Sequence, residues 1–344
     1  MDRGNRSFVA LVGLAIAPFA AAAAMGCVAL WCLSAGVQAP SWASFLAVLT
    51  SALIAAGMAR ATRCAIAQRR ATSQLTTTVS DHRQPCPPRV EDLARAAGLD
   101  EVEVVDDNDR YAYTYGLRSP RVVVSRGLIE CAGEAELIAV FAHERHHAAQ
   151  RDPLKVALAR MIAAATGPVL PAVDILLWRY LVGRELDADR HAIERCGRPA
   201  VAGALLQAAS GPPEVGLGAA AAIAAPDMLE VRLDQLERSA APALPAIPNR
   251  DMGQTAVGLA AVTLGLTTSL MWLDRAAAAG LPVGDRLQGM GGVATCGALW
   301  ILGASALWLR LPSPRSGQRG LRDPTQQAPL KPWPYRCDVG RHGS

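Results

Sequence analysis

Four long apolar runs, two near each end of the chain, dominate the pattern of hydrophobic and polar positions. They cover Phe8–Ala35, Ser41–Ala59, Thr255–Leu273 and Gly289–Leu309. None of these runs contains a charged residue, and each is close to or above the roughly 20 apolar residues that cross a bilayer as a helix. The pattern therefore predicts two transmembrane hairpins, one at each end of the chain.

Basic residues flank both hairpins on the outside, whereas the link between the first two runs carries no charge. The flanking residues are Arg3, Arg6, Arg60, Arg63, Arg69, Arg70, Arg310, Arg315, Arg319, Arg322 and Lys331. Because positive charge favours the cytoplasmic side, we expect a multi-pass protein of the cell membrane whose central part is cytoplasmic. A signal peptide is disfavoured, since the first run is too long for one and a second run follows closely.

The central part of the chain mixes polar and apolar residues and is expected to fold as a domain. The predicted organisation is a transmembrane hairpin over residues 1–60, a cytoplasmic domain over 61–250, a second hairpin over 251–311 and a basic tail over 312–344. The tail is rich in Pro, Gly and Arg, which is typical of disordered segments. We find no internal repeat.

Local patterns predict both helices and strands within this domain. Runs of β-branched residues between turn residues predict strands at Val102–Val105 and Arg121–Ser125. Tyr111–Tyr115, in which Tyr alternates as on one face of a strand, is predicted to be a further short strand. Helical spacing of apolar residues predicts helices at Glu91–Ala97, Gly133–Gln150 and Ala172–Ile193. A further helix is expected to begin with Asp152 as its N-cap and Pro153 at its first position. The Pro-rich stretch Asp81–Pro88 is expected to be a linker.

Composition and cysteine spacing argue against a nucleic-acid-binding protein, a disulfide-rich scaffold and a zinc finger. Apolar residues make up 51% of the chain and charged residues only 19%, with a net charge of +4. Because the small basic excess is scattered beside the apolar runs, we expect a lipid bilayer as partner and no nucleic acid. The eight cysteines form no CxxC pair, which indicates free thiols in a reducing compartment and not a disulfide framework or a zinc finger.

The chemistry is concentrated in one predicted helix. His143-Glu144-Arg145-His146-His147 contains the pattern HExxH. Residues four apart share one face of a helix, so His143 and His147 can present their imidazoles to a single metal ion. Glu144 is rotated to the edge of that face, where its carboxylate can take a proton from a zinc-held water. The plainer interpretation is a surface helix with coincidental histidines.

The next predicted helix offers a third ligand. A catalytic zinc requires three protein ligands and an open position. Glu185 and Asp189 lie one turn apart on that helix, and Pro-containing segments allow it to fold back beside the first. The strands before the first helix could also provide an edge for an extended peptide substrate.

The chain resembles the gluzincin membrane peptidases of the HtpX and CAAX-prenyl-protease type, and the related BlaR/MecR-type antirepressor peptidases. The resembling segments are 113–116, 122–128, 143–152 and 185–189. The resemblance implies zinc ligation by His143, His147 and Glu185. It also implies catalysis by Glu144 as the base, with Asp189 orienting a ligand histidine. The implied fold is mostly α: a multi-span membrane protein with a zincin-like α+β domain, in which a small sheet packs on the HExxH helix.

Two departures from HtpX-like members stand out. Leu154–Val182 contains charged residues, and its longest uncharged stretch, Met161–Val173, is too short to cross a bilayer. A helical hairpin at the membrane surface is therefore expected, as in the antirepressor branch. HtpX-like members also commonly have a His-Pro pair, followed by an Arg, downstream of the third ligand. Here the His is absent, because the pair is Ala225-Pro226, and the following Arg is Arg232. Arg232 is assigned a structural role.

The sequence thus predicts a membrane-embedded zinc endopeptidase that cleaves cytoplasmic or membrane-associated proteins, either in regulatory repressor cleavage or in protein quality control. The alternative is a non-catalytic membrane-anchored signalling or scaffold protein that retains the zinc fold. No oligomeric state is assigned. Two other histidines receive no chemical role: His146 is expected to face solvent, and His191 to pack or to lie at the surface.

Overall fold

The computed structural model describes residues 4–15, 20, 41–209, 226–238, 242, 244 and 246–278. Most of the first apolar run, all of the fourth run and the predicted tail at 312–344 lie outside the described residues. Within the described part, no helix combines the length and hydrophobicity that a membrane span requires. The run Ser41–Ala59 lies in the first half of α2, and the run Thr255–Leu273 lies within α10.

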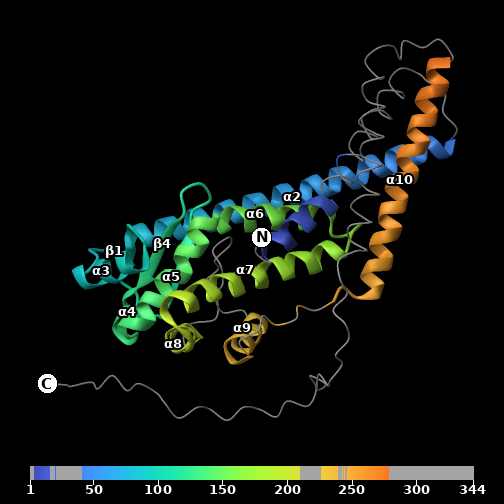
Figure 1. Ribbon diagram of the computed structural model, residues 1–344. Coiled ribbons are helices and arrows are strands. Elements are labelled where there is room, and N and C mark those ends of the chain that lie inside the picture. The colour runs from blue at the N-terminus through green and yellow to red at the C-terminus, as the bar shows by residue number, and fades with distance from the viewer. Residues whose placement is uncertain are drawn as a thin grey trace, which may run out of the picture. The chain divides into compact units, whose positions relative to one another are not determined.

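The described residues are mostly helical and include one small sheet, as predicted (Figure 1). A helix over residues 4–15 precedes α2 (Ser41–Asp81), α3 (Pro88–Ala97), α4 (Arg126–Cys131), α5 (Glu134–Gln150), α6 (Asp152–Thr166), α7 (Ala172–Cys196), α8 (Arg198–Ala209), α9 (Pro226–Arg238) and α10 (Asn249–Ala278). The strands are β1 (Arg83–Gln84), β2 (Glu103–Val105), β3 (Ala112–Tyr115) and β4 (Arg121–Ser125). Their order is β1-β2-β4-β3, with β2 and β4 parallel and the other pairs antiparallel.

The three predicted strands and helix α5 are confirmed to within one residue at each end. Helices α3 and α7 are also confirmed, but α3 begins three residues earlier than predicted and α7 ends three residues later. Gly98 ends α3 with a φ of 84°, a left-handed conformation that glycine adopts without strain. The linker predicted at Asp81–Pro88 is wrong in part, because Arg83 and Gln84 pair with β2 as strand β1. Helix α2 also continues through Arg60 to Asp81, across the predicted domain boundary at residue 60.

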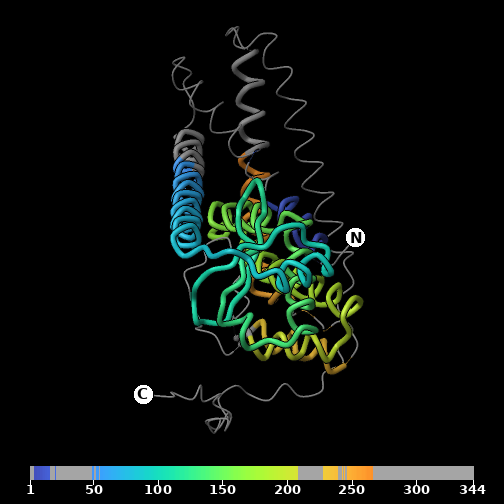
Figure 2. The backbone as a smooth tube through the Cα atoms, turned by 90° about the vertical axis from the view of Figure 1, so that its left-hand side faces the viewer, coloured from blue at the N-terminus to red at the C-terminus, as the bar shows by residue number. Residues whose placement is uncertain are grey.

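Alternate residues of the sheet pack in opposite directions, as the pleat requires. Val105, Tyr113, Tyr115 and Val123 pack against Leu75 and Val79 near the end of α2, which Figure 2 shows running beside the strands. Val104, Ala112, Val122 and Val124 join the main core with Leu137 and Phe141 of α5. Helix α5 contacts the sheet, α3, α7 and α8, so the small sheet does pack on the helix that carries HExxH.

Candidate metal centre

Helix α5 holds His143, Glu144 and His147 in its second half, and all three are buried. Its first turn is stabilised by the Gly133 amide, which donates to Glu136 Oε2 over 3.0 Å. Its end is set by Arg151, whose φ of 53° turns the chain sharply into α6. All three chemical side chains are at most 6% exposed, although they are polar, so each needs a partner.

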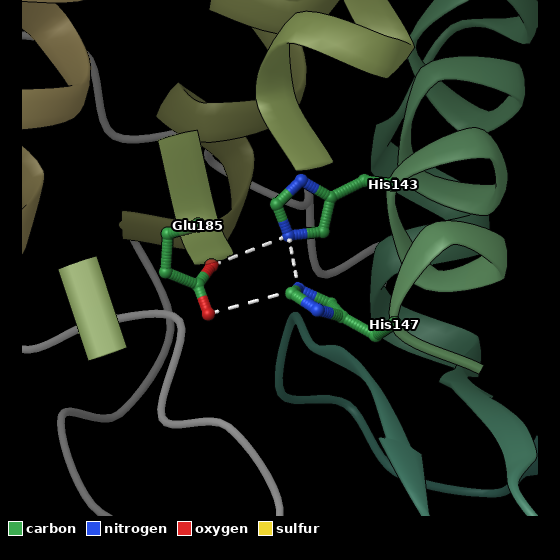
Figure 3. Close-up of side chains that lie close together, drawn as sticks. All are labelled: His143, His147 and Glu185. Atoms are coloured by element: carbon green, nitrogen blue, oxygen red, sulfur yellow. Dashed lines mark hydrogen bonds and ion pairs between the residues drawn. The ribbon is translucent and has the colours of Figure 1, made fainter. Parts of the chain in front are cut away.

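Glu185 of α7 meets the two imidazoles (Figure 3). The two Nε2 atoms of His143 and His147 are 3.0 Å apart. Glu185 Oε2 lies 3.3 Å from His143 Nε2, and Glu185 Oε1 lies 3.6 Å from His147 Nε2. Ligands held tetrahedrally at about 2.1 Å from a zinc ion are roughly 3.4 Å apart. One ligand atom from each of the three residues lies within 4.8 Å of the others, so the two rings and the carboxylate are close enough to share one metal ion.

The far nitrogens of both rings are held by carboxylates. His143 Nδ1 lies 2.9 Å from Asp189 Oδ1, and His147 Nδ1 lies 2.7 Å from Asp152 Oδ2. An ionised carboxylate accepts only, so each Nδ1 donates its proton, and each ring in its neutral form keeps the lone pair on Nε2. Both lone pairs are therefore available to a metal ion, next to a Glu185 Oε2 that is buried without a hydrogen-bond partner among the described residues.

The predicted role of Asp152 as an N-cap is wrong. Arg151, in its left-handed conformation, takes the cap position, and Asp152 is the first residue of α6. The sharp turn at Arg151 carries the Asp152 side chain back toward the helix that has just ended. Its carboxylate therefore accepts from His147 and caps no helix.

Two buried arginines complete the charge pattern. Arg232 of α9 donates from Nε and Nη2 to the two carboxylate oxygens of Asp189, each over 2.7 Å, and Arg184 Nη2 donates to Glu185 Oε1 over 2.9 Å. The buried charges around the two rings belong to Glu144, Asp152, Glu185, Asp189, Arg184 and Arg232. When both imidazoles are neutral, as metal ligation requires, these groups carry an excess of two negative charges, which a divalent cation would compensate.

The titration of these groups follows from the same contacts. Burial opposes protonation of His143 and His147, but Asp189, Glu185 and Asp152 outweigh it and raise the pKa of both rings. Burial likewise opposes ionisation of Glu185 and Asp189. The charges of His147 and Arg184 hold the pKa of Glu185 well below its usual range, and Arg232 lowers the pKa of Asp189. Glu185 and Asp189 are thus kept ionised. Glu185 requires this to ligate a metal ion, and Asp189 requires it to accept from His143.

Glu144 lies beside this cluster and contacts a strand. The Thr114 hydroxyl of β3 is 2.8 Å from Glu144 Oε2 and 2.9 Å from the Glu144 backbone oxygen. A small hollow opens next to His143, Glu144 and Arg232. Its remaining walls are mainly small and aliphatic side chains from β3, α4, α5, α7 and α8, namely Ala112, Leu128, Ala139, Val140, Ala192, Val201, Ala204 and Leu205.

The structure brings together every residue that the sequence singled out: His143, Glu144, His147, Glu185 and Asp189. It adds Thr114, Asp152 and Arg184, which sequence reasoning did not assign to the site. His146 does not face solvent as predicted. It is half-buried, with its ring centroid 5.4 Å from that of His191, and burial lowers its pKa to about 4.

Comparison with known families agrees with this geometry. Residues 87–240 match the model of Peptidase family M48. This segment begins just before α3 and extends just past α9, so it contains all the residues of the centre. A comparison with curated proteins found no match for the chain.

Proposed function

We propose, from the premise that residues 87–240 form a metallopeptidase domain of peptidase family M48, that this protein is a zinc-dependent endopeptidase. The observation that carries the proposal is the convergence of His143, His147 and Glu185 within 4.8 Å of one another. Glu144 stands beside that cluster and lines the adjacent hollow. The other acid that lines the hollow, Asp189, accepts from Arg232 and contacts His143 Nδ1.

The donor set favours zinc among the common divalent ions. Two imidazole nitrogens and one carboxylate oxygen, with one position left for substrate or water, are typical of catalytic zinc. Magnesium and calcium prefer sites made of oxygen alone. Bound at this position, zinc would supply Lewis acidity to the attacking water and to the scissile carbonyl.

The side chains around the metal position divide the remaining work. Glu144 takes a proton from the attacking water and passes it to the nitrogen of the leaving amine. Thr114 fixes one carboxylate oxygen of Glu144, which leaves the other free for the proton transfer. Asp189 and Asp152 hold the rings of His143 and His147 in the tautomer that ligates through Nε2.

The substrate we propose is an extended segment of a cytoplasmic or membrane-associated protein. Strand β3 is an edge of the sheet, so its outer backbone groups are available to a peptide that adds as a further strand. Thr114, which contacts Glu144, lies on this strand, so such a peptide would pass close to the base. The apolar hollow beside Glu144 and Arg232 would receive one of its side chains.

Removal of the metal tests the proposal directly. We expect the purified protein to bind one zinc per chain, to lose hydrolysis of an unfolded protein substrate when a chelator removes the zinc, and to regain it on addition of zinc alone. His143→Ala should abolish stoichiometric zinc binding, whereas His82→Ala, a change at an exposed histidine, should not. A protein that hydrolyses equally well with and without the metal would refute a metallopeptidase.

We also propose a location in the cell membrane, with several spans and the metal centre on the cytoplasmic side. Support comes from the four uncharged apolar runs and from large apolar side chains exposed to solvent on two helices. These are Leu49, Leu53 and Met58 of α2 and Val257 and Leu264 of α10, at 44% to 70% exposure. Solvent-exposed apolar side chains gathered on a helix favour contact with lipid.

Membrane extraction tests this location. We expect the full-length protein to stay with the membrane pellet after an alkaline carbonate wash and to require detergent for release, because integral spans resist such a wash. Extracellular protease applied to intact cells should leave residues 87–240 uncut. Release by carbonate alone would contradict integral insertion, and cleavage of the domain in intact cells would contradict the cytoplasmic side.

A further inference from the structure

The helix over residues 4–15 packs on protein, against α6 and α7 (dark blue in Figure 1). Leu11, Leu14 and Ala15 are at most 8% exposed and share a core cluster with residues of α6 and α7. The Phe8 ring lies 5.2 Å from the ring of Tyr180, centroid to centroid. The segment therefore belongs to the core of the domain that carries the metal centre.

The first two described residues of this helix, Gly4 and Asn5, lie behind the metal centre. The Gly4 amide donates to Asp187 Oδ2 over 3.0 Å, and Asp187 follows the ligand Glu185 by two positions. Asn5 Oδ1 accepts from Lys155 Nζ over 3.1 Å, and Lys155 lies one turn after Asp152, the partner of His147. Gly4 and Asn5 thus tie together the two helices that position Glu185 and His147.

Gly4 lies so close to the backbone of α7 that a side chain at this position would require that backbone to shift by a few tenths of an ångström. A Cβ atom at this position would lie 3.0 Å from the Arg184 nitrogen and 3.2 Å from the Arg184 Cα. Arg184 is also the residue whose guanidinium donates to Glu185 Oε1. A shift of the 4–15 helix would therefore directly displace the part of α7 that carries the ligand Glu185.

The contact between Gly4 and Asp187 is electrostatically favourable. The first amides of a helix have no partner within the helix, and the helix dipole places partial positive charge there. Asp187 is 4% exposed and also accepts from Arg190, so its carboxylate is fixed before it meets Gly4. A small polar cavity lined by Gly4, Asn5, Tyr180 and Arg184 lies next to this contact.

From these contacts we propose that residues 4–15 act as an amino-terminal latch, in which Gly4 and Asp187 are positioning residues that hold Glu185 in the geometry for zinc. The proposal rests on the proposed function. Loosening the latch leaves all three ligands in the chain but lets the 183–187 stretch of α7 move relative to α5. Groups that orient metal ligands contribute about 10- to 100-fold in metal affinity, and we expect about tenfold for this more remote contact.

Two pairs of full-length variants test the latch. Asp187→Ala removes the acceptor for the Gly4 amide, whereas Asp187→Asn keeps an acceptor oxygen. Gly4→Ala places a methyl group against the backbone of α7, whereas Gly253→Ala makes the same change in α10, where a Cβ would meet nothing within 4 Å. The readouts are zinc affinity by competition with a chelator and the visible absorption of the Co²⁺-substituted protein, which reports ligand geometry.

We expect Asp187→Ala and Gly4→Ala to weaken zinc binding about tenfold and to change the Co²⁺ spectrum, while Asp187→Asn and Gly253→Ala match the parent. Parent affinity and spectrum in all four variants would overturn the latch, and so would an equal loss in Asp187→Asn and Asp187→Ala. If Asp187→Ala does not fold, the glycine pair decides alone. A parent protein that binds no zinc would instead overturn the proposed function, and the latch with it.

Discussion

Glu144→Gln should lower kcat by about 10²- to 10⁴-fold while zinc remains bound. This range is the usual contribution of a general base. The carboxamide has nearly the size of the carboxylate, and its oxygen can still accept from the Thr114 hydroxyl, which lies 2.8 Å from Glu144 Oε2. It cannot take a proton from water near neutral pH, so the chemical step is lost and the fold is kept. The measurement is kcat at saturating substrate, together with the zinc content of the same sample.

The matched control lies on the same helix. Glu134→Gln changes an exposed carboxylate in the first turn of α5 and should leave kcat within about twofold of the parent, since general-base catalysis does not involve it. Parent activity in a zinc-loaded Glu144→Gln protein would mean that another group moves the proton, and the proposed division of work among the side chains would be wrong.

The sequence predicted those parts of the centre that depend on helical periodicity. His143 and His147 are four residues apart on a helix, and so are Glu185 and Asp189, so each pair shares a face wherever the helices lie. The meeting of the two helices was inferred from the Pro-containing segments between them and from the resemblance to a known family, since helical spacing alone does not bring two helices together. Asp152 was noted in the sequence but was assigned to capping a helix and not to contacting His147. The reason is that the left-handed turn at Arg151 leaves no sequence signal that distinguishes this Asp from an ordinary N-cap.

Other parts depend on contacts between elements that are far apart in the sequence. Thr114 faces Glu144 because β3 packs on α5, and a lone Thr in a strand gives no sign of this. The docking of residues 4–15 was missed for a different reason. An apolar helix looks the same in sequence whether it is covered by lipid or by protein, so Phe8–Ala35 was interpreted as a span from its start. Strand β1 has only two residues, too few to form a pattern.

Arg232 is the residue whose loss should cost the most stability. It is 3% exposed, and it donates two hydrogen bonds to a buried Asp189 carboxylate, with Nη1 3.6 Å from Glu185 Oε2. Arg232→Leu leaves that carboxylate buried with His143 as its remaining partner. Removal of one member of a buried ion pair typically costs about 3–5 kcal/mol, and we expect that loss in the free energy of unfolding of the metal-free protein, measured with denaturant.

The comparison that isolates this effect is Arg238→Ala, at the end of the same helix α9. Arg238 also pairs with an acid, Asp234, at 2.6 Å, but its side chain is 74% exposed, so water replaces the lost contact and the cost should be about 0–1 kcal/mol. If the two variants unfold alike, Arg232 does not stabilise the ionised Asp189 as described. If only Arg232→Leu is destabilised, and its zinc affinity falls as well, α9 contributes to both fold and metal site through one carboxylate. That carboxylate belongs to Asp189, which also fixes the ring of His143.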